Sequence, residues 1–461
     1  MNFQSILIAN RGEIAVRVIR AAKALGLQTV QVYSDADKES LAVRLADESV
    51  NIGPPAAAKS YLNIGAIIDA AKAAKVDAIH PGYGFLSENA DFVDAVEAAN
   101  MVFIGPSGNS IRLLGNKIAA RQIAEEAGVP TVPGSDGKVA DLDAGRLVVA
   151  QIGYPVMIKA AAGGGGRGIR IASNIEEFER FFPQASAEAF SAFGDGSLYI
   201  EKLIETARHV EVQILGDGEN FVHCFERECS MQRRRQKVWE EAPALCLSPE
   251  IRTALCDRAV ALARQVKYEG AGTVEFLYDQ KAEEFYFIEV NTRIQVEHTI
   301  TEAITGIDLV QEMIRIAGGE GLSVKQEDLR VSGHAIECRI NAEDPAKDFM
   351  PWPGLVDTLE IPKGDGIRFD TLLYPGYSIP PFYDSLLGKL IVWGEDRADC
   401  LSRLRHALKV LKISGVPTTI PLHIALANDE DVSNGTFDTK FLETWLETKF
   451  TTANNQIEEI A

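Results

Sequence analysis

The sequence predicts an α/β and α+β protein of several domains that begins with a doubly wound parallel sheet. Three observations predict this class. Strand-like apolar runs alternate with helical periodicities over the first part of the chain, which indicates a parallel sheet with helices on both faces. A smaller α/β segment surrounds a run of four glycines, and the last part is strand-rich before it ends in helices. At 461 residues the chain can hold about two to four domains with buried cores.

Composition and charge exclude several classes of function. Apolar residues make up 46% and charged residues 24%, as in ordinary soluble proteins. The net charge of -20 argues against general binding of nucleic acid or anionic membranes, which requires a basic face. The six cysteines form no CxxC pair, which fits a reducing compartment. The apolar run at 6–9 is too short for a signal peptide. We therefore expect a soluble, cytoplasmic protein.

The first domain is expected over residues 1–115. SILIAN and TVQVYS are strand-like, and EIAVRVIRAAKALG between them has helical periodicity and ends in glycine. The pattern continues through AIIDAAKAAK, VDAIHPG, DFVDAVEAAN and MVFIGPS. The first turn, ANRGEIA, lacks G-x-G-x-x-G, so a dinucleotide site is not expected there.

Three further segments complete the expected organisation. Residues 116–331 form a central domain, within which about 131–203 are a small α/β unit that begins after a helix stopped by Gly128 and Pro130. Residues 332–450 form a C-terminal domain, and 451–461 a polar tail.

The glycine run lies between YPVMIKA and IRIAS, which are both strand-like. Gly163, Gly165 and Gly168 satisfy G-x-G-x-x-G, but a dinucleotide loop opens a helix, and a Walker A loop would need Lys and Ser/Thr after the last glycine. A glycine loop between two strands instead indicates a flap over phosphates, with Lys159 as a point charge. A flexible hinge or a tight packing turn remains the alternative.

Residues 270–293 indicate a hairpin with opposed carboxylates. If its turn centres near residue 282, Glu275 lies opposite Glu289, and strand alternation puts Phe285, Phe287, Glu289 and Asn291 on one face. Opposed like charges destabilise a sheet unless a cation lies between them, and hard cations such as Mg²⁺ prefer such oxygen ligands. The hairpin therefore predicts a metal–nucleotide site, with two solvated glutamates as the alternative.

Two polar clusters accompany this hairpin. In a strand, Arg233, Arg235 and Lys237 would share a face that could hold an anion, although a solvated basic face is the alternative. NTRIQVEHT places Arg293, Gln295 and Glu297 at alternate positions followed by His298, and a glutamate beside an arginine can act as general base toward a small oxyacid. His209 lies on an alternating strand. The neighbours Cys338 and Arg339 are ambiguous.

Taken together, HPGYGFLSENA, IKAAAGGGGRG, CSMQRRRQK, GAGTVEF, FIEVNTRIQVEH and HAIECRINAED resemble biotin carboxylase of the ATP-grasp superfamily. The resemblance runs in order from residue 6 to about residue 450. It implies an ATP-grasp architecture: an N-terminal Rossmann-like domain, a central nucleotide domain with a mobile lid and a C-terminal mixed α/β domain. It also implies ATP- and bicarbonate-dependent carboxylation of biotin via carboxyphosphate, as in acetyl-CoA carboxylase of fatty acid biosynthesis and related acyl-CoA, pyruvate or urea carboxylases.

The resemblance also implies a role for each matching residue. The residues matching the ATP site are Lys117, Lys159, Gly164, Gly165, Gly166, Glu201, Lys202, Leu203, Ile204, His209, Gln232, Arg235 and Leu277. Those matching the bicarbonate pocket are Lys237, Arg293, Gln295 and Val296, with Glu297 as the base; Lys237 and Arg293 also belong to the implied catalytic set. Arg339, as stabiliser of the biotin enolate, and Tyr83 match the biotin site, and Glu275, Glu289 and Asn291 match the Mg²⁺ or Mn²⁺ site.

Two residues depart from the family pattern. Arg235 stands where histidine or asparagine is usual, which puts the ribose-side contacts in question, and Thr299 replaces a usual proline.

An absence in the sequence indicates the partners. None of the six methionines precedes a lysine, so the biotinylated Ala-Met-Lys-Met-like site is missing. We expect a stand-alone subunit, a separate biotin carboxyl carrier protein and carboxyltransferase, and a homodimer. The rivals are an ATP-grasp ligase with another acceptor and a catalytically silent nucleotide-binding regulatory subunit.

Overall fold

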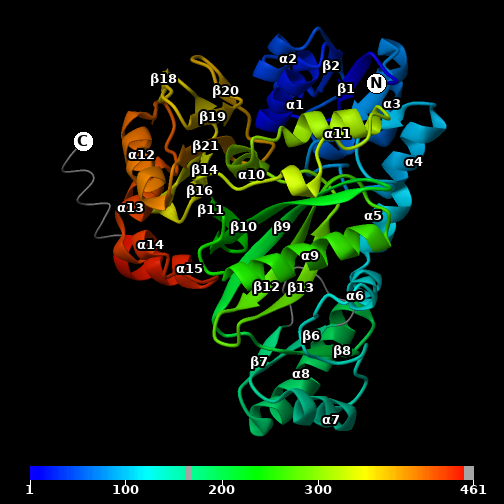
Figure 1. Ribbon diagram of the computed structural model, residues 1–461, viewed down its shortest axis with the longest axis vertical. Coiled ribbons are helices and arrows are strands. Elements are labelled where there is room, and N and C mark those ends of the chain that lie inside the picture. The colour runs from blue at the N-terminus through cyan, green and yellow to red at the C-terminus, as the bar shows by residue number, and fades with distance from the viewer. Residues whose placement is uncertain (161–168, 451–461) are drawn as a thin grey trace.

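The computed structural model describes residues 1–160 and 169–450, and it begins with the predicted parallel sheet (Figure 1). The strand order is β3-β2-β1-β4-β5. The strands are β1 Ser5–Ile8, β2 Gln28–Tyr33, β3 Glu48–Asn51, β4 Ala78–His80 and β5 Val102–Phe103. The helices are α1 Gly12–Ala24, α2 Leu41–Leu45, α3 Ile64–Ala74, α4 Ala90–Ala98 and α5 Gly108–Gly115.

Helices cover both faces of this sheet, as predicted for a doubly wound fold. On β1, Ile6 and Ile8 pack with Ile14 of α1, whereas the intervening Leu7 packs with Ile67 of α3 and Phe92 of α4. Alternate residues of one strand therefore serve two different cores, which is the property of a sheet buried on both faces.

A small unit follows the first domain and lies at the bottom of Figure 1. It follows helix α6 (Lys117–Glu126), which packs in the core of the large sheet described next, and its elements are α7 Leu142–Ile152, β6 Val156–Ala160, β7 Arg170–Ala172, α8 Ile175–Phe193 and β8 Leu198–Lys202. β6 pairs antiparallel with both β7 and β8. The prediction that strands flank the glycine run on both sides is thus confirmed, while Gly164, Gly165 and Gly166 lie outside the described residues.

The described residues form an eight-stranded antiparallel sheet with the order β13-β12-β9-β10-β11-β14-β21-β19. Its strands are β9 Ala207–Asp217, β10 Phe221–Arg233, β11 Gln236–Ala242, β12 Glu269–Asp279, β13 Glu284–Asn291, β14 His334–Asn341, β19 Ile367–Thr371 and β21 Leu386–Gly394. Strand β11, before the expected domain limit at 331/332, pairs with strand β14, after it. The sheet is therefore continuous between the expected central and C-terminal domains.

Helices cover this sheet on opposite faces. Helix α9 (Pro249–Gln265) packs on one face through Leu255 and Leu262, against Val212 and Phe276. Helix α12 (Arg397–Val410) packs on the same side of the other half. Helix α10 (His298–Thr305) covers the opposite face, where Ile300 meets Ala242. The α10 face is the one that carries the charged side chains described below.

The remaining elements are short, apart from two helices. They are α11 Leu309–Ala317, α13 Ile420–Asn428, α14 Glu430–Asn434, α15 Phe441–Trp445, the 3-10 turns η1 Asp35–Asp37, η2 Ala57–Lys59, η3 Gln326–Asp328 and η4 Pro345–Lys347, the π-turn η5 Leu446–Phe450 and the strands β15 Glu343–Asp344, β16 Met350–Pro351, β17 Gly354–Leu355, β18 Leu359–Glu360, β20 Ser378–Ile379 and β22 Lys412–Ile413.

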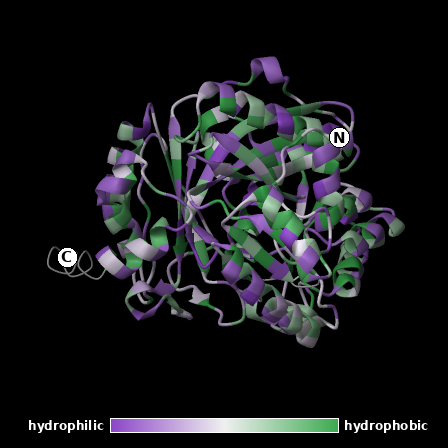
Figure 2. Cartoon of the chain, turned by 90° about the horizontal axis from the view of Figure 1, so that it is seen from below, coloured by the Kyte–Doolittle hydropathy of each residue, from purple (hydrophilic) through white to green (hydrophobic). Residues whose placement is uncertain are grey.

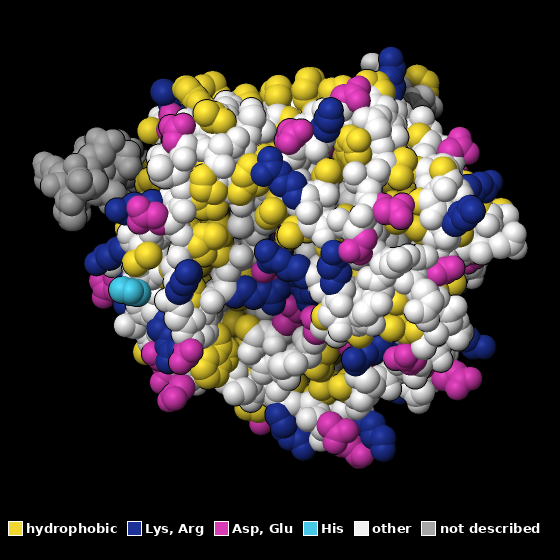
Figure 3. All heavy atoms as spheres, turned by 90° about the horizontal axis from the view of Figure 1, so that it is seen from above, with side chains coloured by type: hydrophobic (Ala, Val, Ile, Leu, Met, Phe, Trp, Pro, Cys, Tyr) yellow, Lys and Arg dark blue, Asp and Glu magenta, His cyan; other side chains and the backbone are white. Residues whose placement is uncertain are grey.

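The distribution of polar residues locates the site. Hydrophilic residues lie on strands in the middle of the molecule as well as on its surface (Figure 2). From above, basic and acidic side chains gather in a hollow at the centre of the face (Figure 3). All six cysteines are free thiols. Within residues 1–160 and 169–450, no helix combines the length and apolarity needed to cross a membrane.

Candidate active site

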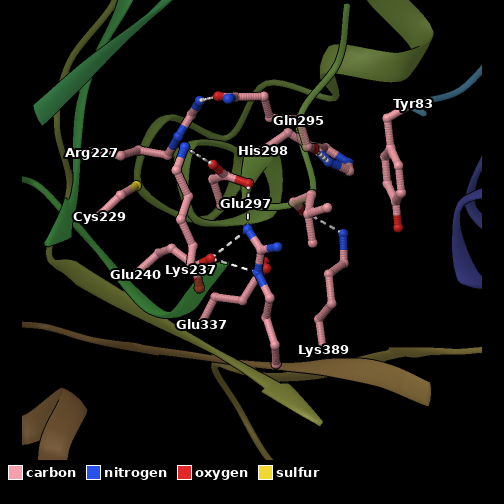
Figure 4. Close-up of polar contacts among 12 residues, drawn as sticks. Tyr83, Arg227, Cys229, Lys237, Glu240, Gln295, Glu297, His298, Glu337 and Lys389 are labelled. Atoms are coloured by element: carbon pink, nitrogen blue, oxygen red, sulfur yellow. Dashed lines mark hydrogen bonds and ion pairs between the residues drawn. The ribbon is translucent and has the colours of Figure 1, made fainter. Parts of the chain in front are cut away.

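The predicted site residues lie mainly on the α10 face of the eight-stranded sheet. Polar side chains lie beside one another on neighbouring strands and so form a row across this face. In one half the set comprises Glu289, Glu275, Glu211 and Arg227, and in the other Glu240, Glu337, Arg339 and Lys389. The segment 292–297, between β13 and α10, passes over this face and adds Gln295 and Glu297 (Figure 4).

Lys237 lies at the centre of this arrangement. Its Nζ donates to Glu211 Oε2 at 2.5 Å, Glu297 Oε1 at 2.6 Å and Glu275 Oε1 at 3.0 Å. Burial alone would lower the pKa of Lys237, but Glu211, Glu297 and Glu275 together raise it well above its usual value. The ammonium is therefore a fixed positive charge toward which three carboxylates converge.

Lys237 reaches this face because β11 contains a bulge. Met231 pairs with Trp239 but Gln232 pairs with Lys237, so Val238 is an extra residue that turns Lys237 away from the face that carries Trp239. The expectation that Arg233, Arg235 and Lys237 share one strand face is therefore wrong.

The basic run forms a hairpin turn. Arg233 pairs with Gln236, and the residues between them, Arg234 and Arg235, adopt positive φ angles of 48° and 67°. The Arg233 guanidinium lies 4.0 Å from the centre of the Phe349 ring and donates to Asp348 Oδ1 at 2.6 Å. Hairpin geometry thus separates these arginines from Lys237, which the alternation of a single strand could not indicate.

Glu297 is held by two cations. Besides Lys237, the Arg339 guanidinium donates to Glu297 Oε2 at 2.9 Å. Burial alone would raise the pKa of Glu297, but Lys237, Arg339 and Arg227 lower it well below its usual range. An anion that drew Lys237 and Arg339 to itself would remove this stabilisation, and the basicity of the carboxylate would rise.

Arg339 and its neighbour Cys338 point in opposite directions, which resolves their ambiguity in the sequence. Cys338 is fully buried in the core with Met231 and Trp239. Arg339 lies on the site face, where its Nε donates to Glu240 Oε1 at 2.6 Å. Only Arg339 can therefore take part in chemistry at this face.

The register of the hairpin is as predicted, with Glu275 directly opposite Glu289. The predicted set of residues on one face is wrong, because Phe276 pairs with Phe287 and Ile288 is an extra residue between Phe287 and Glu289. This bulge sends Phe285 and Phe287 to the core under α9 and leaves Glu289 beside Glu275.

The opposed carboxylates have the character of a cation site. Burial and the nearby Glu275 raise the pKa of Glu289, which Lys117 at the start of α6 lowers in part. Asn291 Nδ2 donates to Glu275 Oε1 at 2.9 Å. Two carboxylates and an amide oxygen are donors that Mg²⁺ or Mn²⁺ accepts, and a cation between them would relieve their repulsion.

Gln295, Val296 and Arg293 occupy the segment that passes over the sheet. Gln295 Nε2 donates to Glu275 Oε1 at 3.0 Å, and the Val296 carbonyl accepts from Lys389 Nζ at 2.6 Å. Arg293 donates to Glu88 Oε2 at 2.9 Å and to Asn291 Oδ1 at 3.0 Å. Among the described residues no hydrogen bond joins Arg293 to Lys237 or Glu297.

Tyr83 follows β4 of the first domain and lies on the side of this segment away from Lys237 (Figure 4). Its hydroxyl donates to Glu13, whose Oε1 lies 3.4 Å from Lys389 Nζ. Tyr83, Arg11 and Asp384 line a cavity of about 200 Å³. A chain of contacts therefore joins Tyr83 to the Val296 carbonyl.

One part of the expected nucleotide set lies on the small sheet or directly after it. The Lys159 ammonium on β6 forms an ion pair with the Glu201 carboxylate on β8. Lys202 Nζ donates to the Tyr154 carbonyl at 2.6 Å. Ile204 packs with Leu277, and the Leu203 N–H donates to the Pro155 carbonyl at 3.0 Å.

A second part of the expected nucleotide set lies on the large sheet. His209 Nε2 is 3.1 Å from Glu275 Oε2, and its Nδ1 is 3.0 Å from Gln232 Nε2. The expected nucleotide and metal residues therefore adjoin at His209.

Two important residues of the site, Glu211 and Arg227, were not predicted from the sequence. Arg227 is fully buried, and its guanidinium donates to Glu211, Gln213, Gln295, Thr273 and Thr301 at 2.7–3.1 Å. Glu211 thereby links Arg227 to Lys237. The available signal was the occurrence of charged residues inside the apolar alternation of HVEVQI and FERECSM.

Known proteins match this chain over nearly its whole length. Three family models match: "Biotin carboxylase, N-terminal domain" at residues 2–111, "Carbamoyl-phosphate synthase L chain, ATP binding domain" at 116–325 and "Biotin carboxylase C-terminal domain" at 337–444. Biotin carboxylase 1 of Bacillus subtilis is 52% identical over 443 residues, which cover 96% of this chain and 98% of that protein.

Two solved structures have the same fold over nearly the whole chain. The biotin carboxylase complex with β-γ-ATP from Campylobacter jejuni is 48% identical with a TM-score of 0.89, covering 96% of this chain and 99% of that one. The biotin carboxylase domain of a thermophilic 2-oxoglutarate carboxylase bound to bicarbonate is 47% identical with a TM-score of 0.92, covering 96% and 98%.

Proposed function

The chain belongs to the biotin carboxylase family, and we propose that the side chains around Lys237 are where it uses ATP and bicarbonate to carboxylate biotin. The observation that carries this proposal is the convergence of Glu211, Glu275 and Glu297 on one ammonium, with Arg339 bridging Glu297 to Glu240. Such a set can bind an anion, deprotonate it and stabilise a second anion beside it.

Bicarbonate is expected to occupy the pocket formed by Lys237, Arg293, Gln295 and Val296. As it attracts Lys237 and Arg339, Glu297 loses part of the stabilisation that holds its pKa low and becomes the base that accepts the bicarbonate proton. The bicarbonate oxygen then forms a bond to the γ-phosphorus of ATP while the bond to ADP breaks, which gives carboxyphosphate. A general base of this kind contributes roughly 10²–10⁴-fold to the rate.

ATP is assigned to the region between the small sheet and the large sheet, with Lys117 and Lys159 beside its phosphates. The remaining contacts are assigned to the flap at Gly164, Gly165 and Gly166 and to Glu201, Lys202, Leu203, Ile204, His209, Gln232, Arg235 and Leu277. Glu275, Glu289 and Asn291 would hold Mg²⁺ or Mn²⁺, which neutralises charge on the transferred phosphoryl group.

Biotin is assigned to the side of Tyr83 and Arg339. Carboxyphosphate breaks its carbon–oxygen bond to give CO₂ and phosphate, the phosphate takes the N1′ proton of biotin, and N1′ bonds to CO₂. Arg339 is suited to stabilise the enolate formed in this step, because its guanidinium is a permanent charge with several donors.

Biotin is expected to arrive on a separate carrier protein, since no methionine in the sequence precedes a lysine, and to pass on to a carboxyltransferase. Two copies of the chain are expected to pair, in the cytoplasm. The division at 1–115, 116–331 and 332–450 stays part of this proposal, supported by the ranges of the three family matches.

The direct test is ADP release from the purified chain with Mg²⁺ and ATP, with and without bicarbonate and free biotin. We expect release that requires bicarbonate and increases with biotin. If another amine or carboxylate acceptor stimulates release and biotin does not, the chain is an ATP-grasp ligase with that acceptor. Nucleotide binding without turnover, even with a biotinylated carrier, would indicate the regulatory subunit.

A further inference from the structure

Two glutamates behind Arg339 carry out no chemical step in the reaction described above. Glu240 on β11 and Glu337 on β14 are direct cross-strand partners, and both are 0% exposed (Figure 4). One oxygen of each, Glu240 Oε2 and Glu337 Oε1, has no hydrogen-bond partner among the described residues. Opposed like charges destabilise a sheet, and a buried carboxylate oxygen without a partner adds a desolvation cost.

The partnered oxygens do not remove this imbalance. Glu240 Oε1 accepts from Arg339 at 2.6 Å, and Glu337 Oε2 accepts from the Thr299 hydroxyl. The Arg339 guanidinium thus faces three carboxylates, since Glu297 is its other partner. Neither lysine nearby is free to help, because Lys237 is engaged by three other carboxylates and Lys389 by Glu13 and the Val296 carbonyl.

We propose that Glu240 and Glu337 share one proton between Glu240 Oε2 and Glu337 Oε1, and that this singly charged pair is a positioning element that leaves Arg339 directed at Glu297. A proton between the two oxygens gives each of them a partner and removes one of the opposed charges. The functional part of this inference rests on the roles proposed above for Arg339 and Glu297.

The electrostatic surroundings agree with this geometry. Burial raises the pKa of Glu240 to about 7 and that of Glu337 well above its usual value. The charged and titratable groups around the pair are Lys237 on β11, Arg339 on β14, Lys389 on β21, and Glu297 and His298 at the start of α10. Burial lowers the pKa of His298 well below its usual value, so this ring stays neutral when the pair titrates.

Loss of the shared proton has a predictable effect on the reaction. A second negative charge would appear behind Arg339, hold the guanidinium more strongly and repel bicarbonate. The KM for bicarbonate should therefore rise as the pair ionises, by about tenfold for one added charge at an effective dielectric constant of about 20. The Thr299 hydroxyl favours ionised Glu337, so Thr299→Val should move this rise to higher pH.

The first experiment measures the KM for bicarbonate from about pH 6 to 9, corrected for the bicarbonate fraction, in the full-length chain. The wild type should show the rise, whereas Glu240→Gln and Glu337→Gln, which cannot carry the second charge, should give flat profiles. The matched control is Glu241→Gln, because Glu241 is the next residue, is equally buried, but lies on the other face with Arg397. A rise of wild-type size in Glu240→Gln and Glu337→Gln would overturn the proposal.

An infrared measurement tests the pair without turnover. At neutral pH, the wild-type minus Glu337→Gln difference spectrum should contain the C=O stretch of a protonated carboxyl group that shifts in D₂O. Glu241→Gln should keep this band. If Glu337→Gln does not fold, the band is followed with pH in the wild type and in Thr299→Val, where it should persist to higher pH. Absence of the band rejects the shared proton, whereas its presence in a protein without carboxylase activity rejects only the proposed function.

Discussion

Strand β11 presents adjacent glutamates to its two faces, and their surroundings could hardly differ more. Glu241, on the α12 face, accepts two hydrogen bonds from Arg397 at 2.7 and 2.9 Å, and others from Trp239 and His334. Burial alone would raise the pKa of Glu241, but His334 and Arg397 lower it well below its usual range. Glu240, on the α10 face, accepts from Arg339 alone among the described residues, and burial raises its pKa. A fully partnered charge is fixed, whereas an incompletely partnered one can respond to a ligand.

The same contrast separates the two arginines of the site face. Arg227 is fully buried and every one of its nitrogens has a partner, so it holds strands β9, β10 and β12 together. The Arg339 side chain is 18% exposed and has two carboxylate partners. We therefore infer that charged residues with all their hydrogen-bond partners stabilise the fold, whereas those with fewer partners take part in the reaction. The following predictions test this division.

The largest effect is expected for Glu297→Gln. The amide keeps the size of the side chain but cannot accept a proton, so bicarbonate-dependent ATP cleavage should fall by roughly 10²–10⁴-fold. The measurement is kcat for ADP release at saturating bicarbonate. As a control, Glu241→Gln should stay within a few-fold of the wild type, because Glu241 faces the opposite side of the sheet. Similar losses in both variants would contradict the division.

Glu241→Ala should lower the stability of the fold. It leaves Arg397 and His334 buried without their carboxylate, and the loss of one member of a buried ion pair costs about 3–5 kcal/mol of unfolding free energy. Urea unfolding measures this cost. Glu320→Ala, which breaks an exposed ion pair with the N-terminus, is the control and should cost below about 1 kcal/mol. Equal costs would show that burial does not distinguish the two pairs.

Glu289→Gln should have opposite effects on metal binding and on stability. With one carboxylate removed, affinity for Mg²⁺ should fall at least about tenfold, because hard cations depend on charged oxygen ligands. Without metal, loss of the repulsion from Glu275 should raise the unfolding free energy by less than about 1 kcal/mol. Calorimetric Mg²⁺ titration and metal-free urea unfolding measure the two effects. A destabilised metal-free variant would argue against repulsion between Glu275 and Glu289.

The two faces should also differ in the pH dependence of stability. Because the folded state lowers the pKa of Glu241, its contribution is complete above the unfolded value near pH 4.3 and is lost as the pH falls. Glu337 has a raised pKa, so its contribution is complete at low pH and declines as the pH rises above about 4.3. Each effect is limited to about 1.4 kcal/mol per pH unit for one proton.

Urea midpoints measured from about pH 3 to 9 separate the two. Glu241→Gln should flatten the acid side of the stability profile, and Glu337→Gln should flatten the decline toward neutral and alkaline pH. Identical profiles for both variants would show that the two faces are not electrostatically distinct.

The sequence predicted the doubly wound first domain and the strands around the glycine run, because these depend on periodicity within short segments. It also predicted that Glu275 lies opposite Glu289, which follows from the length of one hairpin. It failed where bulges at Val238 and Ile288 reverse the alternation. A bulge depends on contacts between strands far apart in the chain, and so does the role of Arg227, whose partners come from four separate segments.

The smallest expected effect concerns Arg235, where the sequence departs from the family. Its φ of 67° is a left-handed conformation that asparagine adopts more readily, so Arg235→Asn should raise the unfolding free energy by less than about 1 kcal/mol. The Arg235 side chain is exposed, so it is not one of the buried charges with all their partners. Thermal unfolding and the KM for ATP are the measurements. A gain in stability with unchanged KM would make Arg235 a turn residue, whereas a several-fold change in KM would place it with the adjustable charges that contact substrate.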